Sequence, residues 1–400
     1  MEPGSYSIGK GCMTVDAGAV RRICVVTGTR AEYGLLKPVM EEIRNSGLQL
    51  RLVVAGMHLS HEFGNSYQVI ERDGFEIAAR IDMLLSGDNH AAMAKSIGIG
   101  IYGMAQALES LDPDLVLVLG DRVEAFAGAV SGAGLNKIVA HLHGGEVTRG
   151  GLDESMRHAI SKFAHLHFVA TEGSRVRLIK MGERQDTIHR VGAPGLDPIL
   201  NTKLLGLDQV AETLGIVVKA PFLVIVQHPV STDAEAAESQ MRETLEAAKS
   251  VSLQSIVIYP NSDSGGRRMI EVIESYRGEP WLHIFRNLSH EMYLSLLKHA
   301  AVLIGNSSSG IIEAPSFHLA VVNIGSRQTG RERSNNVIDV SPARSAISEA
   351  IHRALYDTEF RSSLCACVNP YGDGEASRRV VQVIRGLKVG PHILQKQLSC

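Results

Sequence analysis

The sequence predicts an α/β protein with two domains, each built around a parallel sheet. Its 400 residues are enough for two domains, or three. It has 39 glycines but only nine phenylalanines, nine tyrosines and one tryptophan, which favours tight strand-to-helix turns and aliphatic cores. From residue 21 onward, short β-branched runs alternate with longer segments of helical period. This alternation is typical of βαβ units and parallel sheets.

The predicted strands fall into two series, separated by the segment APGLDPIL at residues 193–200. The first series is Ile23–Thr27, Leu50–Ala55, Leu115–Gly120, Ile138–Leu142 and His167–Ala170. The second is Phe222–Gln227, Ser255–Tyr259, Leu282–Phe285, Ala301–Gly305 and Ala320–Ile324. We interpret residues 1–20 as a polar, disordered lead-in, and the two series as two Rossmann-like domains that face each other and join near residue 195.

Composition excludes several classes of protein. The chain carries 40 Lys and Arg against 43 Asp and Glu, a formal net charge of −3, so it lacks the basic excess of a general nucleic-acid binder. No stretch reaches the ~18 apolar residues of a membrane span, and the first 20 residues lack the apolar region of a signal peptide. Five cysteines without metal-ligand spacing favour the cytosol.

A run of small hydroxyl residues follows the strand predicted at Ala301–Gly305. Ligands of parallel sheets bind beyond the carboxyl ends of the strands, and the N–H groups that open a helix favour an anion. We therefore predict a phosphate site here, with an acidic side chain placed for ribose hydroxyls; the alternative is that the serines only cap the helix. The predicted residues are Ser307, Ser308, Ser309, Gly310 and Glu313.

Three basic residues stand near strand ends and are candidates for the same phosphates. Arg30 and Lys37 flank the first strand-to-helix turn, and His228 follows the first strand of the second series. Taken alone, each basic residue could equally be an ordinary surface charge, and the histidine a structural residue. The sequence has no Walker motif and no usable dinucleotide-binding glycine pattern.

Acidic and basic side chains gather after the third and fourth predicted strands, within 37 residues. A carboxylate at the end of a buried strand either caps a helix or acts on a ligand, and His with Asp and Glu suits proton transfer. Two alternatives remain: an ordinary i, i+4 surface pair of Asp153 with Arg157, and a zinc site at His141, His143 and Glu146. The predicted group is Asp121, His143, Glu146, Asp153 and Arg157.

Nine segments, in this order, resemble the hydrolysing UDP-N-acetylglucosamine 2-epimerases of sialic-acid and related nonulosonic-acid synthesis. They are TGTRAEYG, AGMHLSHEFGNS, LGDRVEAF, HLHGGE, LDESMRHAISK, QHPVST, YPNSDSGG, IGNSSSGIIEAPS and GSRQTGRE. The resemblance implies a GT-B arrangement with the site between two Rossmann-like domains, residues 21–195 and 196–375, the second binding UDP. It also implies that the C-terminal segment 376–400, with a helix near 375–386, returns to the first domain.

The resemblance implies that UDP-N-acetylglucosamine and water give N-acetylmannosamine and UDP. UDP would leave by anti elimination to 2-acetamidoglucal, and water would then add as C2 is reprotonated from the other face. The family's catalytic positions fall on Asp121, Asp153 and the middle of the HxxGGE motif. Several members have Glu at that middle position where this chain has His143, so either His143 or Glu146 is the third catalytic group. The resemblance implies no organic cofactor, no metal, and a homodimer or dimer of dimers.

The resemblance also assigns nucleotide contacts. It places Arg30, His228, Ser307 and Ser308 on the phosphates, Glu313 on the ribose, and His58, Arg122 and Arg327 as further contacts. Four alternatives stay open. They are UDP-2,4-diacetamido-2,4,6-trideoxyglucose as the substrate, a non-hydrolysing epimerase, a GT-B glycosyltransferase and a nucleotide-sugar sensor.

Overall fold

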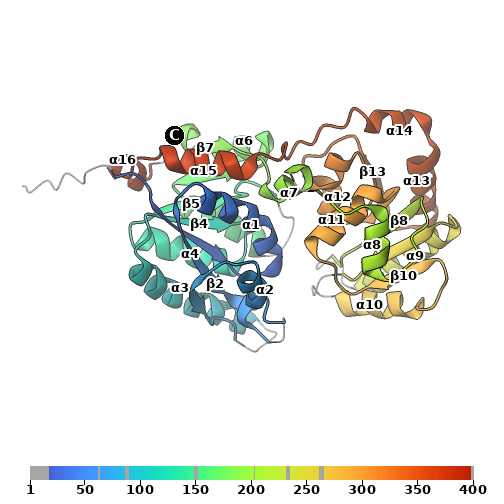
Figure 1. The fold of residues 1–400 in the computed structure, drawn as a ribbon, viewed down its shortest axis with the longest axis horizontal. Coiled ribbons are helices and arrows are strands. Elements are labelled where there is room, and N and C mark those ends of the chain that lie inside the picture. Colours follow the sequence, from blue (N-terminus) through green and yellow to red (C-terminus); the bar gives the residue numbers. More distant parts are fainter. Residues whose placement is uncertain are drawn as a thin grey trace, which may run out of the picture.

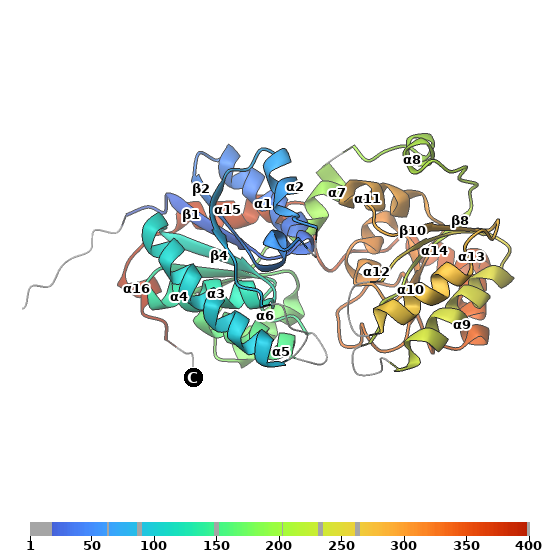
Figure 2. The ribbon, with the colours of Figure 1, turned by 90° about the horizontal axis from the view of Figure 1, so that it is seen from below.

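The two predicted parallel sheets are present, one in each of two α/β domains that lie side by side (Figures 1 and 2). A computed structural model of the chain describes residues 18–61, 64–85, 90–147, 152–201, 203–230, 235–260 and 265–397. Residues 1–17 of the predicted lead-in and the tail beyond 397 lie outside the described residues. The prediction of a two-domain α/β fold is confirmed.

The first domain has a seven-stranded parallel sheet in the order β3-β2-β1-β4-β5-β6-β7. Its strands are β1 (Arg22–Thr27), β2 (Gln49–Ala55), β3 (Ile77–Ile81), β4 (Leu115–Leu119), β5 (Ile138–Leu142), β6 (Leu166–Val169) and β7 (Ile188–Arg190). Its helices are α1 (Arg30–Asn45), α2 (Tyr67–Arg72), α3 (His90–Leu111), α4 (Val123–Gly134), α5 (Leu152–Phe163) and α6 (Glu172–Lys180). Short 3₁₀ helices follow β2 (Gly56–Leu59) and precede β7 (Gln185–Thr187).

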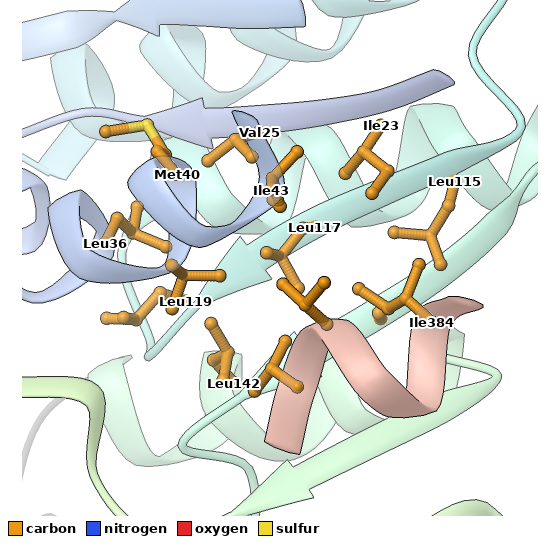
Figure 3. Close-up of a cluster of buried hydrophobic side chains, with 14 of the residues drawn as sticks. Ile23, Val25, Leu36, Met40, Ile43, Leu115, Leu117, Leu119, Leu142 and Ile384 are labelled. Carbon is orange, nitrogen blue, oxygen red and sulfur yellow. The ribbon is translucent and has the colours of Figure 1, made fainter. Parts of the chain in front are cut away.

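Helix α1 shows how the sequence builds this domain. Thr29 caps its first turn, accepting from the Glu32 N–H, while the Glu32 carboxylate accepts from the Thr29 N–H. Leu36, Met40 and Ile43 lie on one face, because their spacing matches the helical period. Figure 3 shows this face packed on side chains of β1 and β4, and each such buried side chain contributes about 1.5–3 kcal/mol.

The second domain has a six-stranded parallel sheet in the order β10-β9-β8-β11-β12-β13. Its strands are β8 (Phe222–Val226), β9 (Gln254–Ile258), β10 (Leu282–Phe285), β11 (Val302–Gly305), β12 (Ala320–Ile324) and β13 (Val337–Val340). Its helices are α9 (Ala237–Ser250), α10 (Gly266–Ser275), α11 (His290–His299), α12 (Ser309–Ile312), α13 (Arg344–Tyr356) and α14 (Thr358–Leu364), with a 3₁₀ helix at Ala314–Phe317. The central strands β8, β11 and β12 are completely buried, as expected of parallel strands covered on both faces.

The chain passes between the domains twice, and the two crossings touch. The Ala193 N–H donates to the Tyr371 carbonyl at 2.7 Å. The outward crossing continues through a 3₁₀ helix (Pro194–Leu196), α7 (Asp197–Asn201) and α8 (Leu207–Leu214). The returning chain forms α15 (Ala376–Gly386) and α16 (Pro391–Leu394), and α15 packs on α1 of the first domain (Figure 1).

The start of α15 is fixed by the outward crossing. The Asp197 carboxylate accepts from the N–H groups of Ala376 and Ser377, at 3.0 and 2.7 Å. Ile384, one of the buried residues of α15, joins the core of the first domain (Figure 3). The first domain is therefore completed by a segment almost 200 residues distant in sequence.

Residues 18–20 also belong to the first domain, although the sequence analysis placed them in the lead-in. Ala19 forms an antiparallel bridge with Lys388, and Val20 is buried in the core. No helix in the described ranges is both long and apolar enough to cross a membrane.

Candidate functional site

The first half of the site lies at the carboxyl ends of β4 and β5. Gly120 directly follows β4 and has φ of +75°, a left-handed conformation that favours glycine, so the chain turns there toward Asp121. The buried His141 ring fixes this turn, because its Nε2 lies 2.8 Å from the Gly120 carbonyl and its Nδ1 lies 3.0 Å from Ser161 Oγ. The turn that presents Asp121 is thus held from the neighbouring strand.

Arg157 of α5 joins the two strand ends. Its guanidinium pairs with the Asp121 carboxylate and donates to the His143 carbonyl at 2.9 Å. The side chains of Arg157 and Asp121 are 6% and 17% exposed, so the pair is largely shielded from solvent. His143 has φ of +60°, an uncommon conformation for a residue other than glycine, and the bond from Arg157 helps to hold it.

His143 and Glu146 form a buried pair. The His143 Nδ1 lies 2.5 Å from Glu146 Oε1. Burial opposes ionisation of Glu146, but the interactions with His143 and Arg157 lower the pKa of this carboxyl to about 2. The His143 Nε2 is buried and has no hydrogen-bond partner among the described residues. A carboxylate that orients one imidazole nitrogen and leaves the other available is an arrangement suited to proton transfer.

Arg122 and Asp153 complete this half of the site. Arg122 interacts electrostatically with Glu124 and Glu32, and also with Asp153 and Asp121. Asp153 lies in the first turn of α5 and is half-buried. The alternative of an ordinary surface pair does not describe Arg157, because this side chain is buried and pairs with Asp121.

The zinc alternative finds no support in this geometry. Both ring nitrogens of His141 face other groups, and burial lowers the pKa of this histidine to about 3. Within the described residues, no three or more His, Cys, Asp or Glu side chains are grouped so as to hold a metal ion.

The second half of the site lies at the carboxyl ends of β8 and β11, which approach each other closely. At Gly305, with φ of +131°, a Cβ atom would lie 2.1 Å from the Val226 carbonyl oxygen. The next residue, Asn306, accepts from the His228 N–H at 2.7 Å and donates to the His228 carbonyl at 2.9 Å. Asn306 was not among the predicted site residues, although its place directly after a buried strand was a usable signal.

The serine run differs from its prediction in one respect. Helix α12 has only four residues, and the chain continues as a 3₁₀ helix that contains Pro315. The serines are therefore not at the N-terminus of a long helix with a large dipole. Ser307 Oγ accepts from the Ser309 N–H at 3.3 Å and donates to Ser309 Oγ at 3.2 Å. Ser308 makes no capping bond with its side chain. Any anion here would be bound by local N–H and hydroxyl groups.

Three further predicted residues surround this loop. Burial and the nearby Arg327 lower the pKa of His228 to about 4, so its ring is neutral at pH 7. Arg327 donates to the Asn306 carbonyl at 3.2 Å. Burial raises the pKa of Glu313 to about 7, and its Oε2 is buried without a hydrogen-bond partner among the described residues. Gly310 packs on β12, where a Cβ would lie 2.8 Å from Val321, so packing explains this glycine.

The structure does not bring all predicted residues to this edge. Lys37 pairs with Asp73 at 2.9 Å, away from the strand ends. His58 is fully buried, with Nε2 3.1 Å from Thr27 Oγ1 and Nδ1 2.8 Å from Ser66 Oγ, and burial lowers its pKa to about 4. These contacts make His58 a structural residue in place of the predicted substrate contact.

Arg30 differs from Lys37, because it is the exposed first residue of α1. It stands at the carboxyl end of β1, as predicted.

One loop of the second domain reaches the first. Arg331 interacts electrostatically with Glu146 and Glu313, which belong to different domains. The neighbouring Glu332 carboxylate accepts from the Gly173 N–H at 3.2 Å, at the start of α6. Sequence reasoning missed both residues, although they stand in the quoted segment GSRQTGRE. The two halves of the site thus face each other across this contact.

Comparison with known proteins identifies the family. The sequence profile of the UDP-N-acetylglucosamine 2-epimerase family matches residues 41–385. A hydrolysing UDP-N,N'-diacetylbacillosamine 2-epimerase of Legionella pneumophila is 43% identical over 378 residues, 94% of this chain and 99% of that protein. A UDP-N-acetylglucosamine 2-epimerase of Neisseria meningitidis is 34% identical over 84% of this chain and 88% of that protein.

A solved structure is similar in fold. The crystal structure of UDP-GlcNAc 2-epimerase from Neisseria meningitidis bound to UDP-GlcNAc has a TM-score of 0.78 and 19% identity, covering 91% of this chain and 99% of that one. The two parallel sheets facing each other here are thus a known GT-B-like arrangement. On this evidence, the chain belongs to the UDP-N-acetylglucosamine 2-epimerase family.

Proposed function

We propose that the protein is a hydrolysing 2-epimerase that converts a UDP-2-acetamido sugar and water into the free 2-epimeric sugar and UDP. The observation that carries this proposal is the link that Arg157 makes between two proton-handling groups. One is the Asp121 carboxylate, and the other is the His143–Glu146 pair. Epimerisation at C2 removes a proton from one face of the sugar and returns a proton to the other face. It therefore needs a proton-handling group on each face.

The proposed mechanism has two steps. In the first, Asp121 or Asp153 takes the C2 proton while the C1–O bond to UDP breaks, giving a 2-acetamidoglucal and UDP. In the second, a proton returns to C2 on the opposite face and hydroxide from water adds at C1. His143 is suited to the second step, because Nδ1 is held by Glu146 and the buried Nε2 has no partner among the described residues.

The second domain is proposed to hold UDP. Ser307, Ser309 and the N–H groups of α12 offer hydrogen bonds to the diphosphate, and Arg30 approaches from the first domain. His228 is neutral without ligand, so a diphosphate beside it would raise its pKa and recruit a proton. Negative charge grows on the diphosphate as the C1–O bond breaks, so these contacts would also favour its departure.

We propose UDP-2,4-diacetamido-2,4,6-trideoxyglucose, also called UDP-N,N'-diacetylbacillosamine, as the preferred sugar. The sequence analysis placed UDP-N-acetylglucosamine first. Its motifs concern UDP and C2, and they hardly distinguish sugars that differ only at C4 and C6. The order is reversed here because the Legionella relative, 43% identical over nearly its whole length, is named for the diacetamido sugar. UDP-N-acetylglucosamine stays the second candidate, supported by the Neisseria relative. Either product is a starting sugar for a nonulosonic acid.

One experiment tests both the reaction and the substrate. The protein is incubated with each UDP-sugar in D₂O, and products are identified by NMR. We expect free UDP and a 2-epimeric sugar carrying deuterium at C2, formed faster from the diacetamido sugar. UDP-linked epimer without free UDP would show a non-hydrolysing enzyme instead, and transfer to an added acceptor would show a glycosyltransferase. No change with either sugar would contradict the proposal.

A further inference from the structure

Two buried glutamates that the mechanism does not use lie beside the catalytic residues of the first domain. Glu32 is in the first turn of α1 and is 6% exposed, and Glu124 is in the first turn of α4 and is fully buried. Buried carboxylates are costly unless they are paired or protonated, so each requires an explanation.

Gly28 places the two carboxylates close together. The Gly28 N–H donates to Glu32 Oε2 at 2.9 Å. A Cβ atom built on Gly28 would lie 2.4 Å from Glu124 Cδ. Gly56 confines the same side chain from the other side, since its Cβ would lie 2.0 Å from Glu124 Oε1. The ends of β1 and β2 therefore form a cradle of two glycines that the Glu124 side chain fills.

Arg122 is the cation that this pair faces. It is the N-cap residue of α4, two positions before Glu124, and Glu124 and Glu32 are its first two electrostatic partners, ahead of Asp153 and Asp121. Among the described residues, no side chain donates a hydrogen bond to either carboxylate oxygen of Glu124. The backbone N–H groups of Met57 and of Glu124 itself favour the charged form of this carboxylate. Arg122 thus interacts electrostatically with two carboxylates that the proposed mechanism does not use and with two that it does.

We infer that Glu32 and Glu124 form a carboxylate pair that retains a proton at neutral pH and holds the Arg122 guanidinium beside Asp121 and Asp153. Both are positioning residues, since Glu124 is fully buried and Glu32 is only 6% exposed. Burial and the neighbouring Glu124 raise the pKa of Glu32 to about 8, and burial also raises the pKa of Glu124. The ring of His58, two residues after Gly56, is neutral at pH 7 and bonded to Thr27 and Ser66.

One consequence concerns pH. As the pH rises through about 8, Glu32 loses its proton, and the added charge facing Arg122 pulls the guanidinium away from the catalytic pair. This part of the inference depends on the proposed epimerase activity. We expect kcat/KM to fall above about pH 8 in the native protein, and we expect Glu32→Gln and Glu124→Gln to move or remove that fall. At pH 7 Glu32→Gln also carries no charge at this position, so its kcat/KM should stay within about threefold of the native value, with UDP affinity within twofold, and the difference should appear above pH 8. Glu109→Gln, on the exposed face of α3, is the control.

A second measurement does not need activity. Infrared spectra of the full-length protein labelled with ¹³C-glutamate should show, at pH 7, a protonated C=O component that both Gln variants lose. The band of Glu313, whose pKa is about 7, should remain in the variants. If the native protein releases no UDP from either sugar, the proposed function fails while the component lost in the variants still decides whether the pair exists. No such component in the native protein, or an unchanged pH profile in both variants, would overturn the inference.

The glycine cradle is tested by a double-mutant cycle. Gly28→Ala should lower the thermal unfolding temperature in the native background, because the new Cβ meets Glu124. In a Glu124→Ala background the same Gly28→Ala change should cost little, since the space is then free. Gly34→Ala is the matched control, because no atom lies within 4 Å of its Cβ position. Equal losses from Gly28→Ala in both backgrounds would contradict the cradle.

Discussion

The two domains share one sheet type, yet their contributions to the site differ in kind. The first domain gathers ionisable groups that are buried and tied to one another, such as Asp121, Arg157 and Glu146. The second presents hydroxyl, amide and backbone groups, together with a histidine whose ring is neutral at pH 7. This difference is the basis of the proposed division of labour, in which one domain moves protons and the other binds the nucleotide.

Substitution of the acids should test this division most severely. If Asp121 or Asp153 handles the C2 proton, Asp121→Asn and Asp153→Asn should each lower kcat by about 10²–10⁴-fold, because an amide cannot accept the proton. UDP affinity, measured by calorimetry, should stay within a few fold. Asp112→Asn, an exposed carboxylate near the opposite ends of the strands, is the matched control. Near-normal turnover in either active-site variant would remove that residue from the mechanism.

The His143–Glu146 pair should give the next largest effect. His143→Ala should lower kcat about 10²-fold and let 2-acetamidoglucal accumulate, because C2 reprotonation is slowed. Glu146→Gln keeps a hydrogen-bond acceptor beside Nδ1 but loses its charge, so a smaller loss is expected. NMR in D₂O measures both the glycal and the deuterium at C2. Normal turnover of His143→Ala with an inactive Glu146→Gln would assign the third catalytic role to Glu146.

The sequence predicted the centre of each sheet better than its edges. Ten predicted strands are present to within a residue or so at either end, but β3, β7 and β13 were not predicted, and each is an edge strand. Edge strands in this fold are only partly buried and do not form the continuous apolar runs of central strands; β13, for example, has no fully buried residue. Hydrophobic pattern alone therefore could not separate them from loops.

The candidate site was predictable where chemistry follows a strand end directly. Asp121, His143 and the serine run obey this rule, and the structure places them at the expected edges. The role of Glu124 was not predictable, because it depends on two glycines from other strands that leave room for one side chain. The burial of His58 was not predictable for a similar reason, since its partners Thr27 and Ser66 lie on separate segments.

Nucleotide contacts should give intermediate effects. Arg30→Ala and His228→Ala should each weaken UDP binding about 10-fold, since a charge-assisted hydrogen bond contributes about 1.5–3 kcal/mol. Lys37→Ala should leave UDP affinity unchanged, because Lys37 pairs with Asp73. Calorimetric titration of UDP measures all three. Loss of affinity in Lys37→Ala, or unchanged affinity in both other variants, would contradict the division between the domains proposed here.

The smallest expected effect is a pH dependence of stability. It concerns the first domain, which contains Glu32. The pKa of Glu32 is about 8 in the folded protein against 4.5 for an ordinary glutamate, so the folded state holds more protons than the unfolded state between these values. The contribution of Glu32 to the free energy of unfolding of the first domain should therefore be at its maximum below pH 4.5. It should decrease as the pH rises toward 8.

Urea unfolding at pH 6 and pH 9 measures this dependence. Glu32→Gln should reduce it, because Gln can still accept from the Gly28 and Thr29 N–H groups but binds no proton. Glu41→Gln is a suitable control, since it changes a glutamate on the same helix that is less buried. An equal pH dependence in the native protein and in Glu32→Gln would show that Glu32 is already ionised at neutral pH, and would contradict the proton-retaining pair.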